Sequence, residues 1–347
     1  MEKPMDVRKF ALDFDLSPFL FCTDSVRGSR IVRAAVDLGV FSRLAKEPGT
    51  AEQVAGSLGI SVRGTRALLD GLTALQLLGK EKASYRLLPI AEALLVPGSP
   101  DYLGDLVQGS VLDQEWDRLA EAVRNGGPAE GVEAVERQKR AEEFFPLLIR
   151  FLHVVNRGPA IAAAHALGAG ASHRGLRVLD IGCGSAVWSL AVGHADPEAR
   201  VTAVDFPGVL AHTRRYVERH GMADRYEYLP GNIQEVSLPE SEYDLAILAN
   251  ILHSEGEAKS RRLLGRVAEA LRPAGRIAIA EFLPNRERTG PLDPVLFGLR
   301  MVLNTEEGGI FSAEEYGEWL AEADFPVVES FEIGSHSPLL VASRGKK

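Results

Sequence analysis

The chain has 347 residues, of which 46% are hydrophobic and 25% charged, as in folded globular proteins long enough for two domains. Its net charge of −9 argues against a general affinity for nucleic acid or for an anionic membrane. Two cysteines without metal-ligand spacing, Cys22 and Cys183, and no apolar run near about 18 residues predict a cytoplasmic protein without disulfides, bound metal or membrane partner.

Residues 1–100 are predicted to form a small winged-helix-like domain. Ser25 to Leu44 carries apolar residues at helical spacing. Thr50-Ala-Glu-Gln53 is a capping box, so a short helix should follow it and end at Gly59, and Ser61 can cap the next helix. Residues 79–88 have the pattern of a β-hairpin, which would supply the wing.

Two functions are open to such a domain. A DNA-binding domain would use Arg63 and Arg66 on the third helix. A dimerisation domain would instead join two chains and cover an active site. The acidic composition favours the second interpretation.

Residues 101–167 are predicted to be a helical connector that lines the active site. Trp116 to Val123 should form one helix, and Glu133 to Val155 a longer one that Pro146 could kink. His153 and Asn156 lie beside the apolar stripe of the longer helix. They are more simply explained as paired structural groups than as ligand contacts.

Residues 168–347 alternate between strands and helices, which predicts a mostly parallel, doubly wound α/β sheet. A helix at Leu292–Asn304 is an extra element between two strands, of the kind that shapes a substrate site. The expected strands are Arg177–Ile181, Arg200–Asp205, Tyr226–Leu229, Tyr243–Leu248, Arg276–Phe282, Val327–Glu332 and Pro338–Ala342.

The first of these strands leads into a glycine-rich turn that predicts a nucleotide-like cofactor. Gly182 and Gly184 allow a tight turn, and Asp205 follows at the spacing of an acid that binds ribose hydroxyls. Val187 occupies the place of the third glycine of a dinucleotide-binding motif. Asp180, two residues before the first glycine, would repel a pyrophosphate but attract a cation, so we predict a site for S-adenosylmethionine rather than NAD.

The carboxyl ends of the other strands should meet at the same edge of the sheet. Phe206 follows Asp205 there, and Asn232 and Ile233 are placed to meet the adenine. His253 and Glu281 follow the fourth and fifth strands. A histidine there can take the proton of an acceptor hydroxyl, and a carboxylate can hold its second ring nitrogen, although His253 alone could also be a capping or surface residue.

With these motifs the chain resembles the small-molecule O-methyltransferases that include plant caffeic-acid, acetylserotonin and bacterial hydroxyneurosporene methyltransferases. The resemblance covers nearly the whole chain and rests on residues 28–41, 180–184, 204–207, 250–253 and 271–281. It implies a class I S-adenosylmethionine methyltransferase domain with a Rossmann-like sheet, an N-terminal winged-helix dimerisation domain and a homodimer. It also implies His253 as the catalytic base and Glu281 as its supporting acid.

The chain departs from the plant members of this family at three places. Ser254-Glu255 replaces an Asp-Trp pair after the histidine, Asn232 replaces an aspartate, and Ile310 falls where a second catalytic glutamate stands. By the same alignment the substrate-lining residues are Phe151, Val155, Met301 and Thr305. Their apolar character suits an aromatic or polyketide-like acceptor, though each could equally belong to the core.

The sequence therefore predicts methyl transfer from S-adenosylmethionine to a hydroxyl of a small metabolite. Ser254, Glu255 and Ile310 keep a second enzymatic hypothesis open, which is methylation of carbon or nitrogen or a repurposed reaction in the same fold. A third hypothesis is a DNA-binding regulator that senses a ligand through a degenerate methyltransferase domain.

Overall fold

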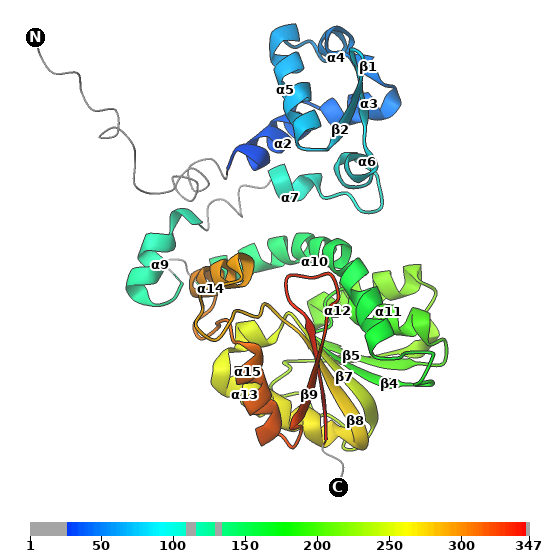
Figure 1. The fold of residues 1–347 in the computed structure, drawn as a ribbon, viewed down its shortest axis with the longest axis vertical. Coiled ribbons are helices and arrows are strands. Elements are labelled where there is room, and N and C mark those ends of the chain that lie inside the picture. Colours follow the sequence, from blue (N-terminus) through cyan, green and yellow to red (C-terminus); the bar gives the residue numbers. More distant parts are fainter. Residues whose placement is uncertain (1–25, 109–115, 129–133, 345–347) are drawn as a thin grey trace, which may run out of the picture. The chain divides into compact units, whose positions relative to one another are not determined.

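The computed structural model describes residues 26–108, 116–128 and 134–344, and only the backbone of 134–144. The chain divides into two compact units, Met1–Ser110 and Val111–Lys347 (Figure 1). Ser25, Cys22 and Glu133, which entered the sequence-based predictions, lie outside the described residues. Cys183 is a free, buried cysteine.

The first unit is built from short helices and a three-stranded antiparallel sheet of order β1-β3-β2, as predicted for a helical domain with a wing. Thr50 and Gln53 form the expected capping box, and Gly59 ends that helix in the left-handed conformation. Ser61 caps the next helix by accepting a hydrogen bond from the backbone of Gly64. The elements are α2 (Arg27–Asp37), α3 (Val40–Lys46), β1 (Gly49–Thr50), α4 (Ala51–Leu58), α5 (Val62–Ala74), β2 (Leu78–Glu81), β3 (Ser84–Leu87), α6 (Pro89–Leu95) and α7 (Gly104–Gln108).

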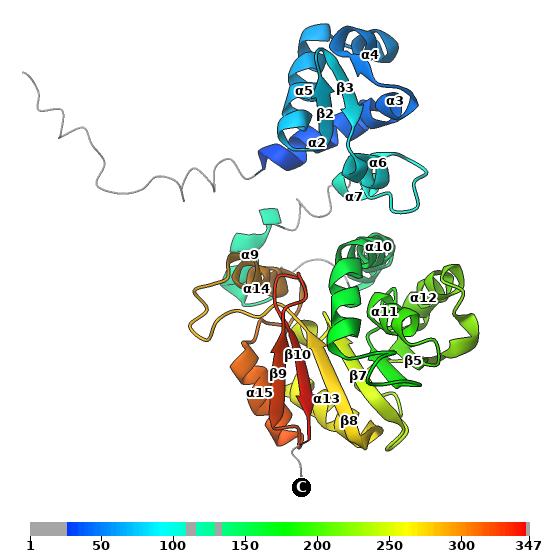
Figure 2. The same ribbon diagram turned by 45° about the vertical axis from the view of Figure 1, so that its right-hand side comes forward.

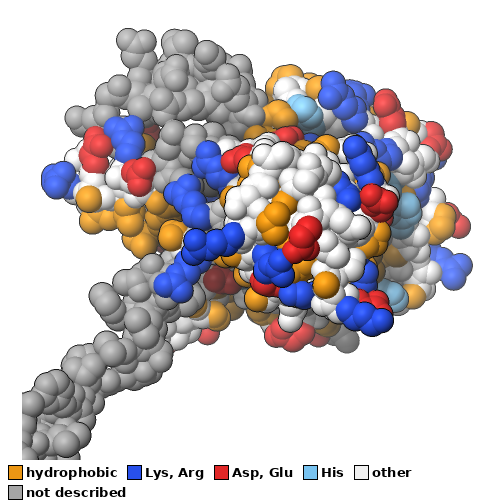
Figure 3. Space-filling model, turned by 90° about the horizontal axis from the view of Figure 1, so that it is seen from above, with side chains coloured by type: hydrophobic (Ala, Val, Ile, Leu, Met, Phe, Trp, Pro, Cys, Tyr) orange, Lys and Arg blue, Asp and Glu red, His pale blue; other side chains and the backbone are white. Residues whose placement is uncertain are grey.

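The charges on this unit weaken the DNA-binding interpretation. Arg66 forms an ion pair with Glu52, so one of the two arginines proposed to face DNA has an acidic neighbour. Figure 3 draws side chains of both units together, and on the face that it shows both basic and acidic side chains occur, with apolar ones between them. A DNA-binding surface would instead carry a continuous basic field.

The predicted connector, residues 101–167, lies mostly in the second unit, although residues 101–110 belong to the first. Its helices also differ from the predicted bounds. Helix α9 spans Leu119–Asn125 rather than 116–123 and ends at Gly126, which has a positive φ. Helix α10 spans Ala134–Ala166, so the predicted end at Val155 is wrong. Gly158-Pro159 would ordinarily weaken a helix, but the alanines beyond it are buried where α10 packs against α11 (Val187–Ala195), and this packing sustains the helix.

A seven-stranded sheet of order β6-β5-β4-β7-β8-β10-β9 forms the centre of the second unit. The first five strands in this order are parallel, and β10 is antiparallel to both of its neighbours. All seven strands were predicted, although β8 begins five residues earlier than expected, at Leu271. They are β4 (Arg177–Ile181), β5 (Arg200–Asp205), β6 (Tyr226–Pro230), β7 (Tyr243–Ala249), β8 (Leu271–Ala280), β9 (Val327–Phe331) and β10 (Leu339–Ser343).

Helices cover both faces of this sheet (Figure 2). One face packs against α10, α11 and α12 (Pro207–Arg219) and the other against α13 (Leu252–Ala270) and α15 (Ala313–Glu322), each through its own apolar core. The predicted extra helix is α14 (Leu292–Asn304), and a short turn of 3-10 helix, Ala223–Arg225, precedes β6. Because β4 pairs with β5 on one side and β7 on the other, the order of strands reverses beside β4, where α/β sheets bind ligands.

Candidate active site

The turn after β4 requires glycine at its first glycine position. Gly182 has a φ of +65°, and a Cβ there would come within 2.9 Å of the side chain of Ile251, which follows β7. The backbone N–H groups of Gly182 and Cys183 donate to the carbonyl of Val204, which ties the turn to β5. A Cβ built on Gly184 meets no atom within 4 Å, so the turn has open space beside this residue.

Asp180 lies beneath this turn as part of a buried polar chain. Its carboxylate accepts a hydrogen bond of 2.5 Å from the Ser189 hydroxyl, which in turn accepts one from the Tyr226 hydroxyl at 3.1 Å. Burial raises the pKa of the Asp180 carboxyl to about 7, with the Ser189 hydrogen bond opposing this shift and the nearby Asp205 adding to it. A positive charge placed near Asp180 would favour its ionised form.

Asp205 ends β5 beside the turn and accepts two backbone hydrogen bonds. Its oxygens receive the N–H of Gly184 at 3.0 Å and that of Phe206 at 2.8 Å. Burial raises the pKa of the Asp205 carboxyl, and these two N–H groups oppose the rise. The Phe206 side chain is 55% exposed, so it offers an apolar surface at the end of the strand.

The segment after β6 is held in place by α13. Asn232 folds back on its own turn by accepting the N–H of Gln234 at 2.9 Å, while Ile233 is buried. Gln234 donates to the Glu255 carboxylate at 2.8 Å, and the Arg266 guanidinium donates to the carbonyl of Ile233. Glu255, which replaces an aromatic residue of plant enzymes, thus supports the segment that contains Asn232 and Ile233.

His253 and Glu281 meet in a buried hydrogen-bonded pair. His253 Nδ1 lies 2.6 Å from Glu281 Oε2, and Glu281 Oε1 accepts the backbone N–H groups of Ile251 and Leu252, each at 2.8 Å. Both residues are more than nine-tenths buried. Three donors therefore fix the carboxylate, the carboxylate orients the imidazole, and Nε2 is the ring nitrogen that remains for an incoming proton.

Two phenylalanines missed by the sequence analysis lie next to this pair. The Phe297 ring meets the His253 ring edge-to-face, with centroids 4.8 Å apart, and stacks on Phe282 at 4.0 Å. Both phenylalanines keep part of their surface exposed. Phe297 could have been found from its helical spacing, because it precedes the predicted Met301 by four residues on α14.

The predicted acceptor-lining residues have different environments. Met301 is buried on α14, and the Thr305 hydroxyl is engaged locally, since it donates to the Met301 carbonyl and accepts the N–H of Gly308. On α10, Phe151 is partly buried and Val155 is 44% exposed. These four residues remain predictions as contacts of an acceptor.

The turn after Thr305 supports the backbone of His253. The N–H of Gly309 donates to the His253 carbonyl at 2.8 Å, and a Cβ on Gly308 would come within 2.6 Å of that oxygen. Ile310 follows and packs against Gly298 of α14. An apolar contact therefore occupies the place where plant enzymes carry a second acid.

His153 has the structural role that the sequence favoured. It is 4% exposed, its Nδ1 lies 3.1 Å from the Ser185 hydroxyl, and its ring stacks on Tyr216 with centroids 4.2 Å apart. Helix α10 thus contacts the glycine-rich turn through this side chain.

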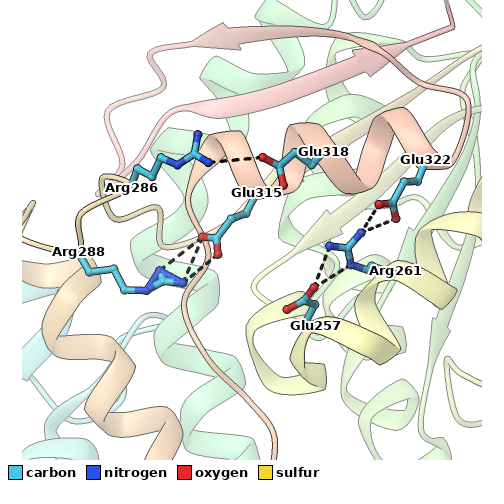
Figure 4. Close-up of polar contacts among 7 residues, drawn as sticks. All are labelled: Glu257, Arg261, Arg286, Arg288, Glu315, Glu318 and Glu322. Atoms are coloured by element: carbon cyan, nitrogen blue, oxygen red, sulfur yellow. Dashed lines mark hydrogen bonds and ion pairs between the residues drawn. The ribbon is translucent and has the colours of Figure 1, made fainter.

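Ion pairs fix the elements around α14 and α15 (Figure 4). Arg288, in the segment that leads into α14, pairs with Glu315 at 3.0 Å, and Arg261 of α13 pairs with Glu322 of α15. Glu315 also closes a capping box with Ser312 at the start of α15. The segments before and after α14 are therefore tied to α15.

The residues described in the two units hold no cluster of three or more side chains suited to bind a metal ion. Within the same ranges, no helix combines the length and the apolar character needed to cross a membrane.

Comparisons with known proteins match both units to domains of O-methyltransferases. The family described as the O-methyltransferase domain matches residues 116–326, and the O-methyltransferase dimerisation domain matches residues 22–97. The chain is 30% identical to 3-hydroxy-5-methyl-1-naphthoate 3-O-methyltransferase of Streptomyces sahachiroi, with 88% of each chain covered. It is 31% identical to acetylserotonin O-methyltransferase of Bos taurus, with 91% of this chain and 94% of the relative covered.

Solved structures are similar over the same length. Human N-acetylserotonin methyltransferase in complex with SAM matches with a TM-score of 0.76 and 25% identity, covering 97% of this chain and 100% of the other. An O-methyltransferase family protein from Burkholderia thailandensis matches with a TM-score of 0.76 and 25% identity, covering 96% and 99%.

Proposed function

This chain belongs to the O-methyltransferase family and uses S-adenosylmethionine, and from that premise we propose that His253 is the base for methylation of a small aromatic or polyketide-like acceptor. The observation that carries the proposal is the buried His253–Glu281 pair, at the ends of two neighbouring strands. Its Nε2 is left free of Glu281, which suits proton abstraction from a hydroxyl.

The residues around the turn after β4 fit the cofactor that the family uses. Two carboxylates suit its cationic and ribose groups, and the turn offers open space at Gly184. When bound, S-adenosylmethionine supplies an electrophilic methyl group on a sulfonium sulfur. The proposed cofactor shell consists of Asp180, Gly182, Gly184, Asp205, Phe206, Asn232 and Ile233.

Asp180→Asn is expected to change the pH dependence of both stability and cofactor affinity. The folded protein keeps the Asp180 proton up to about pH 7, whereas an unfolded chain releases it near the ordinary pKa of 3.8. Because the folded state binds this proton more tightly, the free energy of unfolding should fall as the pH rises from about 3.8 to about 7. The decrease is at most about 1.4 kcal/mol per pH unit. Asparagine does not titrate, so the melting temperature of the variant should fall less between pH 5 and 8.

Cofactor affinity should respond in the opposite direction. A cationic ligand favours ionised Asp180, so wild-type affinity should rise with pH by up to about tenfold per unit below pH 7, and the variant should lose this rise. Thermal unfolding and calorimetric titration with S-adenosylmethionine across this range measure both effects. The exposed Asp224→Asn serves as the matched control, and parallel pH profiles for Asp180→Asn and wild type would contradict the assignment.

His253 and Glu281 divide the proposed chemistry between them. His253 Nε2 takes the proton as the acceptor oxygen becomes a nucleophile, and Glu281 stabilises the imidazolium that results. Burial of both side chains keeps water from competing for that proton. Placing the acceptor oxygen beside the methyl group supplies the rest of the acceleration.

The acceptor class follows from the apolar character of the proposed lining. Phe151, Val155, Met301 and Thr305 are proposed to contact the acceptor, together with the exposed parts of Phe282 and Phe297. The exposed edges of such rings can make edge-to-face contacts with a flat acceptor. The Streptomyces relative is named for a hydroxynaphthoate, and another, from Streptomyces glaucescens, for tetracenomycin polyketide synthesis, which supports the same class.

The domain roles complete the proposal. Residues 1–100 would form the dimerisation domain, 101–167 the connector that lines the active site, and 168–347 the S-adenosylmethionine-binding domain, in a cytoplasmic homodimer. The first unit exposes apolar side chains suited to association with a second copy, at Val26, Leu38, Val62, Leu75 and Ile90. No nucleic acid or membrane partner is proposed.

A screen of phenolic and polyketide acceptors with methyl-labelled S-adenosylmethionine tests the function. We expect label on an oxygen of an aromatic hydroxyl, identified by mass spectrometry and NMR of the product. Label on carbon or nitrogen would favour the second hypothesis, methylation of carbon or nitrogen. That hypothesis is supported by Ile310, which makes an apolar contact where plant enzymes have an acid. Binding to duplex DNA without any methyl transfer would favour a regulator.

A further inference from the structure

The turn that follows α14 lies against a kink in α13, next to the proposed base. Gly256 has φ 75° and ψ 170°, so it separates the single helical turn that carries His253 from the rest of α13. A Cβ on Gly256 would come within 2.5 Å of the Glu307 carbonyl oxygen, and the Lys259 ammonium pairs with the Glu307 carboxylate at 2.9 Å. The turn after α14 is therefore held on both sides of the kink.

The hydroxyl of Thr305 organises this turn. It donates to the Met301 carbonyl at 2.7 Å and accepts the backbone N–H of Gly308 at 3.0 Å. The next backbone N–H, that of Gly309, donates to the His253 carbonyl at 2.8 Å. Two consecutive N–H groups of the turn are thus engaged, one by the Thr305 hydroxyl and the other by the backbone of the proposed base.

Close packing at Gly308 links these two hydrogen bonds. A Cβ there would clash with the Thr305 hydroxyl oxygen and would lie 2.6 Å from the His253 carbonyl oxygen. Only glycine leaves room for both oxygens at once. A change in the position of the turn must therefore also move the peptide group of His253.

The position of that peptide group matters for proton transfer. Glu281 holds the His253 ring at Nδ1 and the two N–H groups that precede the histidine, whereas Gly309 holds the carbonyl that follows it. Nε2 must lie within hydrogen-bonding reach of the acceptor hydroxyl, and a small displacement of a catalytic group lowers the rate strongly.

Resting on the proposed function, we propose that Thr305 is a positioning residue for the base. Its hydroxyl shapes the turn whose Gly309 N–H fixes the His253 carbonyl, and so helps to aim Nε2 at the acceptor oxygen. Its methyl group stays available for the acceptor contact proposed above.

Two substitutions of Thr305 separate the hydroxyl from the methyl group. Thr305→Val keeps the volume of the side chain but removes the acceptor of the Gly308 N–H, whereas Thr305→Ser keeps the hydroxyl. Gly308→Ala perturbs the same turn without changing Thr305. Gly265→Ala is the matched control, because a Cβ at this position of α13 meets no atom within 4 Å.

Two coumarins of similar size report how much the reaction depends on a base. At neutral pH 7-hydroxy-4-methylcoumarin is mostly un-ionised, whereas its 6,8-difluoro derivative is ionised and needs no base. In Thr305→Val and in Gly308→Ala, kcat should fall about tenfold for the un-ionised coumarin and less than about twofold for the ionised one. Thr305→Ser should keep the wild-type ratio of the two kcat values, and Gly265→Ala should change neither kcat.

NMR of the imidazole nitrogens gives a second readout that requires no turnover. The signals of His253 are identified by their loss in His253→Ala. They should move in Thr305→Val and in Gly308→Ala and should coincide with those of wild type in Thr305→Ser. Melting temperatures show that each variant is folded, and Gly308→Ala serves alone if Thr305→Val is not.

Three results would overturn the inference. Equal losses of kcat for the two coumarins, or a change in KM alone, would show that Thr305 only shapes the acceptor site. His253 signals that stay in place in Thr305→Val and Gly308→Ala would show that the turn does not position the ring. If wild type methylates neither coumarin, the NMR comparison decides the inference, and the screen of acceptors decides the proposed function separately.

Discussion

His253→Ala is expected to lower kcat by about 10²- to 10⁴-fold, the range that a positioned general base contributes. The reason is that Nε2 is the nitrogen left after Glu281 engages Nδ1, and alanine has no group to take the acceptor proton. Affinity for S-adenosylmethionine should stay within about twofold, because the proposed cofactor residues lie in other segments. Steady-state kinetics and calorimetry measure the two quantities.

Acceptors of different acidity distinguish two effects of His253→Ala, the loss of a base and a change in the shape of the site. A phenol that is already ionised at the assay pH needs no base, so its methylation should lose much less rate in His253→Ala than methylation of an un-ionised phenol of the same size. The loss should also shrink as pH rises and more of the weaker phenol ionises. An equal loss for both phenols at every pH would contradict the role of His253 as base.

Glu281→Gln should reduce kcat by a comparable factor, about 10²- to 10⁴-fold, through the tautomer of His253. Glutamine has one oxygen, and the N–H groups of Ile251 and Leu252 both require it. The amide NH₂ then faces Nδ1, which must accept a hydrogen bond. The ring proton moves to Nε2, and Nε2 can no longer take a proton from the acceptor.

Folding should survive this change, because the two backbone hydrogen bonds remain. The melting temperature reports that, and NMR of the imidazole nitrogens reports the tautomer. Glu240→Gln, at an exposed position, is the matched control. The double variant His253→Ala, Glu281→Gln should be no slower than His253→Ala by more than about twofold, since both act on one proton transfer; multiplicative losses would show that Glu281 acts independently.

The sequence predicted the sheet well because each buried strand is a short apolar run followed by a turn. The alternation of strands and helices then placed the strand ends at one edge, and so brought His253 and Glu281 together. The capping box of the first unit was predicted equally well, because it depends on two residues that are only three apart in the sequence.

Features that depend on packing between distant segments could not be predicted in this way. Helix α10 continues past Pro159 because its alanines are buried against α11, which no local pattern reports. Asp180 was expected to face a ligand, but its contact with Ser189 is decided by how α11 packs on β4. The stack of Phe282 on His336 joins a strand end to a segment more than fifty residues later in the chain.

Helix α14 is anchored at both of its ends, but by contacts that do not involve Phe297 or Met301. Arg288 holds the segment before it through Glu315, and Gly309 holds the turn after it through the His253 carbonyl. If Phe297 and Met301 contact the acceptor as proposed, mutations there are therefore expected to reshape acceptor preference while these contacts keep the backbone of His253 in place. Such a division lets evolution explore new substrates one substitution at a time without rebuilding the chemistry, and it marks these two positions as the first to randomise in directed evolution.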